Sequence, residues 1–250
     1  MKRHFLAPTP SFGRANSRLP ISHQQRSPYY WWWQYLRRNP AYTSCCENAG
    51  EGKLRQLYAD FGDVRADDFR EWWTRDDRGA KLFAESPLTI KFGELEAVDD
   101  WQPHWSRSDV LVVAVPLTMS KRALRGSFAK LLDNRHKGTK SGRPSMAKAK
   151  EVSTARYKLE RNYTISGLMT ALAVYDLWLA NQQKSKGEQI TLWEIGKVLN
   201  INKPAIRDAE SPLTADRLAG RNVLGATVSR YVRQAKTIID NTSLGKFPLA

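Results

Sequence analysis

Apolar residues recur at three- and four-residue spacing along most of this chain, and that spacing predicts a mainly helical protein. The clearest case is Thr164–Gln183, where Ile165, Leu168 and Leu172 begin a broad apolar stripe typical of a core helix. Further helices are predicted at Ser27–Asn39, Lys53–Phe61, Asp67–Asp77, Ser120–Asn134 and Thr214–Asn241.

One segment has a different pattern. Asp109–Pro116 (DVLVVAVP) is a short β-branched run without alternation, which predicts a strand buried on both faces. Leu88–Phe92 alternates and is its expected partner, and Tyr157–Leu159 is a candidate third strand. The expected fold class is therefore mainly α with a small β element (α+β), with a helix-turn-helix-like helical C-terminal part.

Two short helices are predicted within residues 191–210, TLWEIGKVLNINKPAIRDAE. Thr191 and Glu194 form a capping box, Asn200 tolerates a left-handed turn, and Pro204 suits the first turn of the second helix. Gly196 is small where another helix must cross closely. The predicted buried stripe of the first helix is Ile195, Val198 and Leu199, and that of the second is Ile206 and Ala209.

This order of residues fits a DNA-reading helix-turn-helix, and a purely structural helical corner is the alternative. The residues predicted to face outward are Lys203, Ala205, Arg207, Asp208 and Glu210. Asp208 and Glu210 would meet a phosphate backbone unfavourably, so they favour the structural alternative.

The last predicted helix is the second candidate for recognition. Within it, residues 226–236 (ATVSRYVRQAK) place small and hydroxyl residues before basic ones. Thr227 and Ser229 can hydrogen-bond to bases or phosphates, and arginine reads guanine edges or binds phosphate. The alternative is a solvated basic face on a helix that packs through its apolar stripe.

The charge of the chain favours a polyanionic partner, because 40 Lys+Arg against 25 Asp+Glu give a formal net charge of +15. Residues 121–161 carry thirteen Lys/Arg against three Asp/Glu, whereas residues 47–100 are acidic. Residues 135–150 (RHKGTKSGRPSMAKAK) are basic and almost without large apolar side chains, which predicts a mobile surface loop. Such a loop is either simply solvated or a salt-sensitive contact to nucleic acid.

These differences predict three regions: a flexible basic tail at 1–26, an acidic tryptophan-rich helical region at 27–107, and a basic, mostly helical region at 108–250. The third region would hold the loop at 135–150 and a helix-turn-helix-like unit at 190–241. The tryptophans of the second region have two interpretations, a small core or an aromatic face for a protein partner. That face would comprise Trp31, Trp32, Trp33, Trp72 and Trp73.

Four segments carry a resemblance: YYWWWQYLRRNPAYTSCC, FGDVRADDFREWW, DVLVVAVPLTMSKRAL and VLGATVSRYVRQAKTII. Together they resemble uncharacterised reading frames of phages, plasmids and integrative elements. The first is also similar to the WxxLRRNPxY box of small transcriptional-regulator-like proteins. The resemblance implies a mobile-element setting, where DNA-binding regulators and inhibitors of host-defence complexes such as CRISPR effectors are both common.

Catalytic chemistry has little support in the sequence. The four histidines lie in unrelated contexts, and no zinc-protease, serine-hydrolase, phosphate-loop or dinucleotide motif occurs. Asp60, Asp63, Asp67 and Asp68 lack the spacing of a calcium loop, and a nuclease built from scattered acids is the remaining enzymatic alternative. The adjacent Cys45 and Cys46 are expected to be reduced thiols. We therefore expect no enzyme, metal or cofactor.

No apolar run is long enough to cross a bilayer, and no apolar signal region follows the basic start, so a cytoplasmic location away from membranes is expected. The leading hypothesis is a DNA- or RNA-binding protein, and the alternative is a non-enzymatic inhibitor or adaptor that binds a host protein complex. Oligomeric state is left open. The predicted nucleic-acid contacts are Lys137, Lys140, Arg143, Lys148, Lys150, Lys203, Arg207, Thr227, Ser229, Arg230, Arg233 and Lys236.

Overall fold

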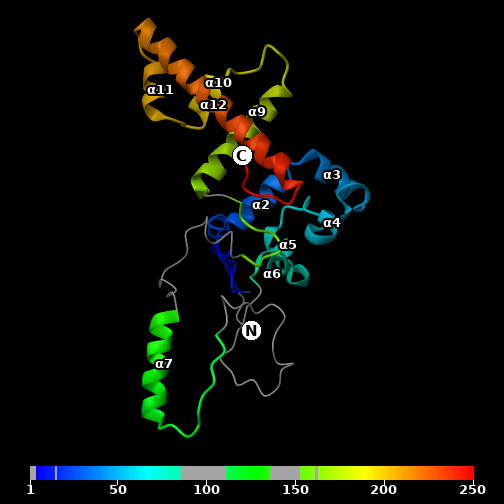
Figure 1. The fold of residues 1–250 in the computed structure, drawn as a ribbon. Coiled ribbons are helices and arrows are strands. Elements are labelled where there is room, and N and C mark those ends of the chain that lie inside the picture. Colours follow the sequence, from blue (N-terminus) through cyan, green and yellow to red (C-terminus); the bar gives the residue numbers. More distant parts are fainter. Residues whose placement is uncertain (1–3, 15, 86–110, 136–152, 161–162) are drawn as a thin grey trace. The chain divides into compact units, whose positions relative to one another are not determined.

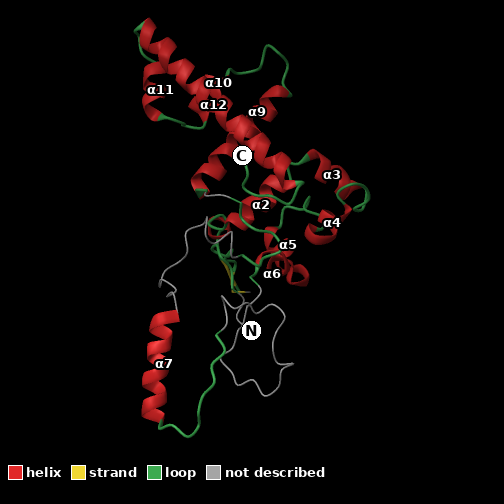
Figure 2. Ribbon diagram, in the orientation of Figure 1, coloured by secondary structure: helices red, strands yellow, loops and turns green. Residues whose placement is uncertain are grey.

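The computed structural model describes residues 4–14, 16–85, 111–135, 153–160 and 163–250. They divide into two compact units, and each is described separately below. Unit 1 holds the described residues before 87 and after 144, and unit 2 holds residues 111–135. Figure 1 follows the chain by colour, and Figure 2 shows that helices dominate the described residues. These residues also contain one two-stranded sheet. The mainly helical fold class with a small β element is confirmed.

The core of unit 1 forms around the aromatic helix α2 (Pro28–Leu36). The Ser27 hydroxyl accepts a hydrogen bond from the Tyr29 N–H, and Pro28 occupies the first turn, where its missing N–H costs nothing. All nine residues of α2 are buried, and Trp32 is fully buried. A helix that is buried on every side must be covered on every side, and several other elements of unit 1 pack around it.

Four short helices and a 3-10 turn complete the front part of unit 1. They are α3 (Pro40–Glu47), α4 (Arg55–Phe61), α5 (Phe69–Thr74), η1 (Arg75–Asp77) and α6 (Arg78–Phe83). Asn39 caps α3 by accepting from the Tyr42 N–H, and Asp68 caps α5 by accepting from the Glu71 N–H. Phe61 and Phe83 from α4 and α6 are buried against Trp32, so these helices cover one side of α2.

The first 26 residues differ from the expected flexible tail. Strands β1 (Gly13–Arg14) and β2 (Ser17–Arg18) pair antiparallel, and α1 (Ile21–Gln24) follows. Ala7 is buried in the aromatic core, and Phe5 and Phe12 pack against that core. Phe5 and Ala7 belong to a three-residue apolar run and Phe12 is isolated, so the segment has no helical or strand periodicity that predicts burial.

The rear part of unit 1 consists of α9 (Ile165–Gln182), α10 (Leu192–Val198), α11 (Lys203–Ala209) and α12 (Thr214–Thr242). Side-chain hydrogen bonds join the rear part to α2 and to the N-terminal cap of α3. The Tyr35 hydroxyl donates to the Leu168 carbonyl at 3.0 Å, and the Asn39 side chain donates to the Ile239 carbonyl at 2.7 Å. Residues 27–85 and 153–250 therefore share one core, which differs from the expected boundary between 107 and 108.

The last residues of the chain return to the aromatic core. Phe247 is fully buried, its ring stacks on Trp32, and its carbonyl accepts from the Glu160 N–H at 2.8 Å. Leu159 and Phe247 form an isolated parallel bridge. The third strand predicted at Tyr157–Leu159 is therefore wrong, because a single bridge replaces a ladder.

Unit 2 contains α7 (Lys121–Arg135), close to the predicted helix. The Ser120 hydroxyl accepts from the Ala123 N–H, as expected of its cap. The preceding strand prediction is wrong for residues 111–116, which are not in a strand, and Val112 is 62% exposed there. A β-branched run needs a hydrogen-bonded neighbour, and no described residue pairs with this one. Its expected partner, Leu88–Phe92, lies outside the described residues.

Candidate nucleic-acid interface

The predicted pair of short helices is present as α10 and α11. The Glu194 carboxylate accepts from the Thr191 N–H at 2.7 Å and from the Thr191 hydroxyl at 2.6 Å, which completes the start of α10. These hydrogen bonds hold the pKa of Glu194 below its ordinary value. Asn200 has φ +52°, as its place in the turn predicts, and Asn202 has φ +59°. Asn202 also caps α11, a role that the sequence analysis missed.

Both short helices pack on α12, and glycines allow the close approach. A β-carbon at Gly196 of α10 would lie 3.2 Å from Val228 and 3.3 Å from Leu224 of α12. A β-carbon at Gly220 of α12 would overlap the backbone nitrogen of Ala209 in α11. The backbones of α11 and α12 thus nearly touch, and α10 approaches the side chains of α12 closely, which fixes the corner formed by the three helices.

The predicted inward faces are partly wrong. Val198 is 65% exposed, because α10 packs through Ile195 and Gly196 instead. Ala205 is buried rather than outward, because it and Ala209 form the face of α11 that packs near Leu224. A glycine or alanine on the packed face carries little hydrophobic signal, so the spacing of large apolar residues misplaced the stripe.

The outer face of α12 brings three of the predicted basic contacts together. Arg233 lies about 180° around the helix from the buried Leu224, and Arg230 and Lys236 lie one turn to either side of Arg233. These three side chains span roughly 9 Å along the helix axis. All three are exposed, and none has an ion-pair partner among the residues that the structure describes.

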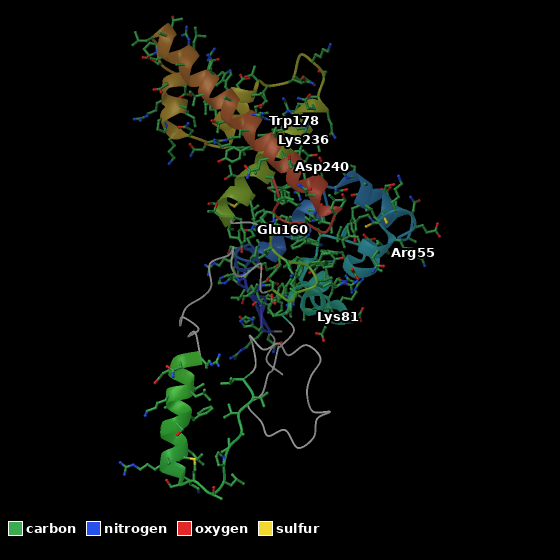
Figure 3. All side chains as sticks on the ribbon, viewed as in Figure 1. Arg55, Lys81, Glu160, Trp178, Lys236 and Asp240 are labelled. Carbon is green, nitrogen blue, oxygen red and sulfur yellow. The ribbon has the colours of Figure 1, made fainter. Side chains whose placement is uncertain are left out.

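The two hydroxyl residues of this helix do not share a face. Ser229 lies on the same side as Arg233, whereas Thr227 is about 160° around the helix from Ser229. The Thr227 hydroxyl donates to the Val223 carbonyl at 2.8 Å within the helix. Only one of the two can therefore meet a ligand on the outer face. Figure 3 shows Lys236 beside Trp178 of α9, where its ammonium group lies 4.1 Å from the ring centroid.

On α11, Lys203 and Arg207 are exposed as predicted. Glu210, one of the two acids that weaken the recognition hypothesis, pairs with Lys197 of α10 at 2.6 Å. This half-exposed pair partly compensates the charge of Glu210 and links the two short helices. Asp208 stays exposed on α11 without an ion pair among the described residues, so one unfavourable charge remains.

Arg221 of α12 has a structural position. Its guanidinium lies 4.4 Å from the ring centroid of Trp193 in α10, and its Nε is buried without a hydrogen-bond partner among the described residues.

The predicted contacts in the basic loop at 135–150 cannot be compared with the structure. Lys137, Lys140, Arg143, Lys148 and Lys150 all lie outside the described residues.

The tryptophans proposed as a partner-binding face are in the core. Trp31, Trp32, Trp33 and Trp72 are 0–6% exposed, and Trp73 is partly buried against Phe83. The surface interpretation is therefore wrong for these four buried residues, since rings packed on every side cannot meet a partner. The alternative interpretation, a tryptophan-rich core, describes them.

The four aspartates considered for metal binding are engaged separately. Asp60 accepts from the Tyr157 hydroxyl, Asp63 and Asp67 pair with Arg65 and Arg37, and Asp68 caps α5. Across the described ranges, no group of three or more His, Cys, Asp or Glu residues could hold a metal ion. Cys45 and Cys46 are free and buried, and burial raises the pKa of the Cys46 thiol.

Comparisons with known proteins do not add a relative. No family model matches this sequence, no curated protein matches it, and no solved structure matches it. In the described part of the chain, no helix combines the length and apolarity needed to span a membrane.

Proposed function

We propose that unit 1 binds nucleic acid, preferably DNA, through α11 and the outer face of α12, as a regulator-like protein of a mobile genetic element. The main support for the proposal is that α12 has one packed face and one open face. The helices α9, α10 and α11 pack on its buried face, and Ser229, Arg230 and Arg233 lie on the face that they leave open.

The charges on this open face favour a polyanion. Arg230, Arg233 and Lys236 follow one side of a helix, and Lys203 and Arg207 add two cations on α11. Arginine and lysine in such rows contact phosphates, and a serine among them can add a hydrogen bond. The helical corner resembles a helix-turn-helix in its order of short helices, so base contacts from α11 are proposed through Arg207.

Salt dependence tests the proposal. If these five cations each neutralise one phosphate, log K should fall with log salt with a slope of about −4.5, or about 500-fold between 50 and 200 mM salt. Fluorescence anisotropy with a labelled DNA duplex and a matched RNA would measure this slope. R230A/R233A should reduce it by about 1.8.

A matched control is available in the loop after α9. Lys184 and Lys186 are exposed, and K184A/K186A removes the same charge from unit 1 outside the proposed face. This control should leave the affinity nearly unchanged apart from a small general effect of charge. A flat salt response, or equal losses in the two double variants, would contradict the proposal. Co-purification of another protein in stoichiometric amount, without a gel shift on DNA or RNA, would instead support the inhibitor or adaptor hypothesis.

A further inference from the structure

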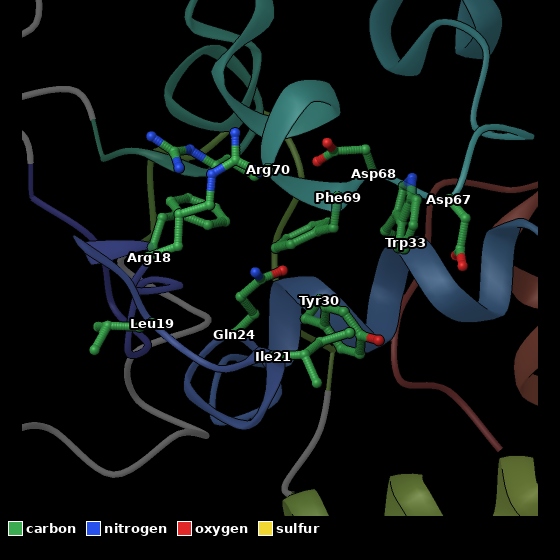
Figure 4. A pocket seen from close by; sticks show the side chains of 11 residues that line it. Arg18, Leu19, Ile21, Gln24, Tyr30, Trp33, Asp67, Asp68, Phe69 and Arg70 are labelled. Carbon is green, nitrogen blue, oxygen red and sulfur yellow. The ribbon is translucent and has the colours of Figure 1, made fainter. Parts of the chain in front are cut away.

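A second feature of unit 1 is a pocket of about 220 Å³ between the N-terminal segment and the aromatic core. Its walls come from the β1–β2 hairpin, α1, α2 and the start of α5 (Figure 4). The aromatic and aliphatic part of the wall is formed by Phe12, Leu19, Ile21, Tyr30, Trp33 and Phe69. Four charged residues, Arg18, Arg70, Asp67 and Asp68, complete the lining with Gln24.

The two acids of the pocket already have partners. The Asp67 carboxylate accepts from the Arg37 guanidinium at 2.5 Å, and this guanidinium lies over the Trp33 ring at 4.5 Å. Asp68 accepts from the Glu71 N–H at 2.9 Å at the start of α5. Their negative charges are therefore partly compensated by groups that do not line the pocket.

The two arginines of the pocket are not directly paired with its acids. Neither Arg18 nor Arg70 has a side-chain hydrogen bond or ion pair among the residues that the structure describes. Figure 4 shows both at one side of the pocket, with Asp67 at the other. Both arginines line the pocket, and a guanidinium group can donate paired hydrogen bonds to a carboxylate or phosphate.

We infer that this pocket binds a small anion with an aromatic ring, namely an aromatic carboxylate of about the size of benzoate. The arginines would hold the carboxylate, and the ring would lie against the aromatic wall. Pockets for drug-sized ligands usually have about 300–1,000 Å³, so this smaller volume suits a single ring. The inference does not depend on nucleic-acid binding, because it uses the hairpin and α5 rather than α11 and α12.

Four probes separate the features that the ligand needs. Benzoate carries both ring and charge, benzamide keeps the ring without charge, benzylamine reverses the charge, and acetate keeps the charge without the ring. A ligand of this size is expected to bind with a dissociation constant of about 1 mM. Ligand-observed NMR titration of the full chain to about 10 mM would measure it. Benzoate should bind at least tenfold more tightly than each of the other three.

Substitutions then locate the site. R18Q/R70Q should weaken benzoate at least tenfold, because charge-assisted hydrogen bonds are lost. R14Q is the matched control, since Arg14 is an exposed arginine of the same hairpin that does not line the pocket, and it should change the affinity less than twofold. Equal thermal midpoints of the variants would show that folding is unchanged. Equal binding of benzamide, no benzoate binding to 10 mM, or unchanged binding in R18Q/R70Q would each overturn the inference.

Discussion

Three glycines of the helical corner provide a sharp test of its packing. Replacement of a helical glycine by alanine stabilises the helix by about 1 kcal/mol in each case, so differences among the three variants report what the new methyl group meets. At Gly225 of α12 nothing lies within 4 Å of the added carbon. G225A should therefore stabilise the protein by about 1 kcal/mol.

The same change at Gly220 has the opposite expected result. Its new carbon would overlap the backbone nitrogen of Ala209 and lie 2.7 Å from the backbone oxygen of Ala205. Backbone atoms cannot rotate away, so α11 and α12 must separate, at a cost of about 3 kcal/mol. The net expectation for G220A is a loss of about 2 kcal/mol. G196A should fall between the two, because its nearest neighbours are side chains that can move.

Urea denaturation curves of the wild type and the three variants, monitored by circular dichroism, would give the three changes in free energy of unfolding. The expected order of stability is G225A, wild type, G220A, with about 3 kcal/mol between the two variants. If G220A is as stable as G225A, then α11 does not approach α12 as described, and the arrangement of the proposed interface is wrong as well.

Three further predictions concern other parts of unit 1. The Arg38 guanidinium donates two 2.6 Å hydrogen bonds to the Asp176 carboxylate of α9. R38A should therefore lower the free energy of unfolding, measured in urea, by about 1–3 kcal/mol. R38K should restore only part of this stability, because lysine cannot form a bidentate pair. Hydrogen bonds from Thr191 hold the pKa of Glu194 below 4.5, so its contribution to stability is present above pH 4.5 and is lost as the pH falls through the folded pKa. E194Q should lower stability at neutral pH and flatten the acid limb of a stability–pH profile, and an unchanged limb would contradict this. Cys45 and Cys46 are buried, so a thiol reagent should modify both in urea and react at least tenfold more slowly with the native protein, and rapid native labelling would contradict this.

The elements that the sequence predicted well have local signals at their ends. Thr164–Gln183 was expected as a helix, and α9 runs from Ile165 to Gln182 with Thr164 as its cap. The capping box at Thr191 and the proline of α11 likewise predicted the two short helices. Hydrogen bonds within a few residues determine such features, so a linear sequence contains the information needed to find them.

The predictions from sequence that are wrong concern properties that depend on residues distant in the sequence. The run at 111–116 has strand-forming residues, yet a strand exists only where another segment supplies its hydrogen bonds. The exposure of Val198 follows from the position of α12, and the burial of the tryptophans follows from helices that close over α2. At the interface, helical spacing alone already separates Thr227 from Ser229, whereas the pairing of Glu210 with Lys197 required the turn geometry.

The return of Phe247 to Trp32 and Tyr35 has a consequence for synthesis on the ribosome. Helix α2 leaves the exit tunnel before the Phe247 ring that covers part of it, which follows more than two hundred residues later. At roughly 5–20 residues per second, this aromatic surface waits ten seconds or more for its cover. Nascent chains of this protein are therefore expected to need chaperone protection of α2 until Phe247 has emerged.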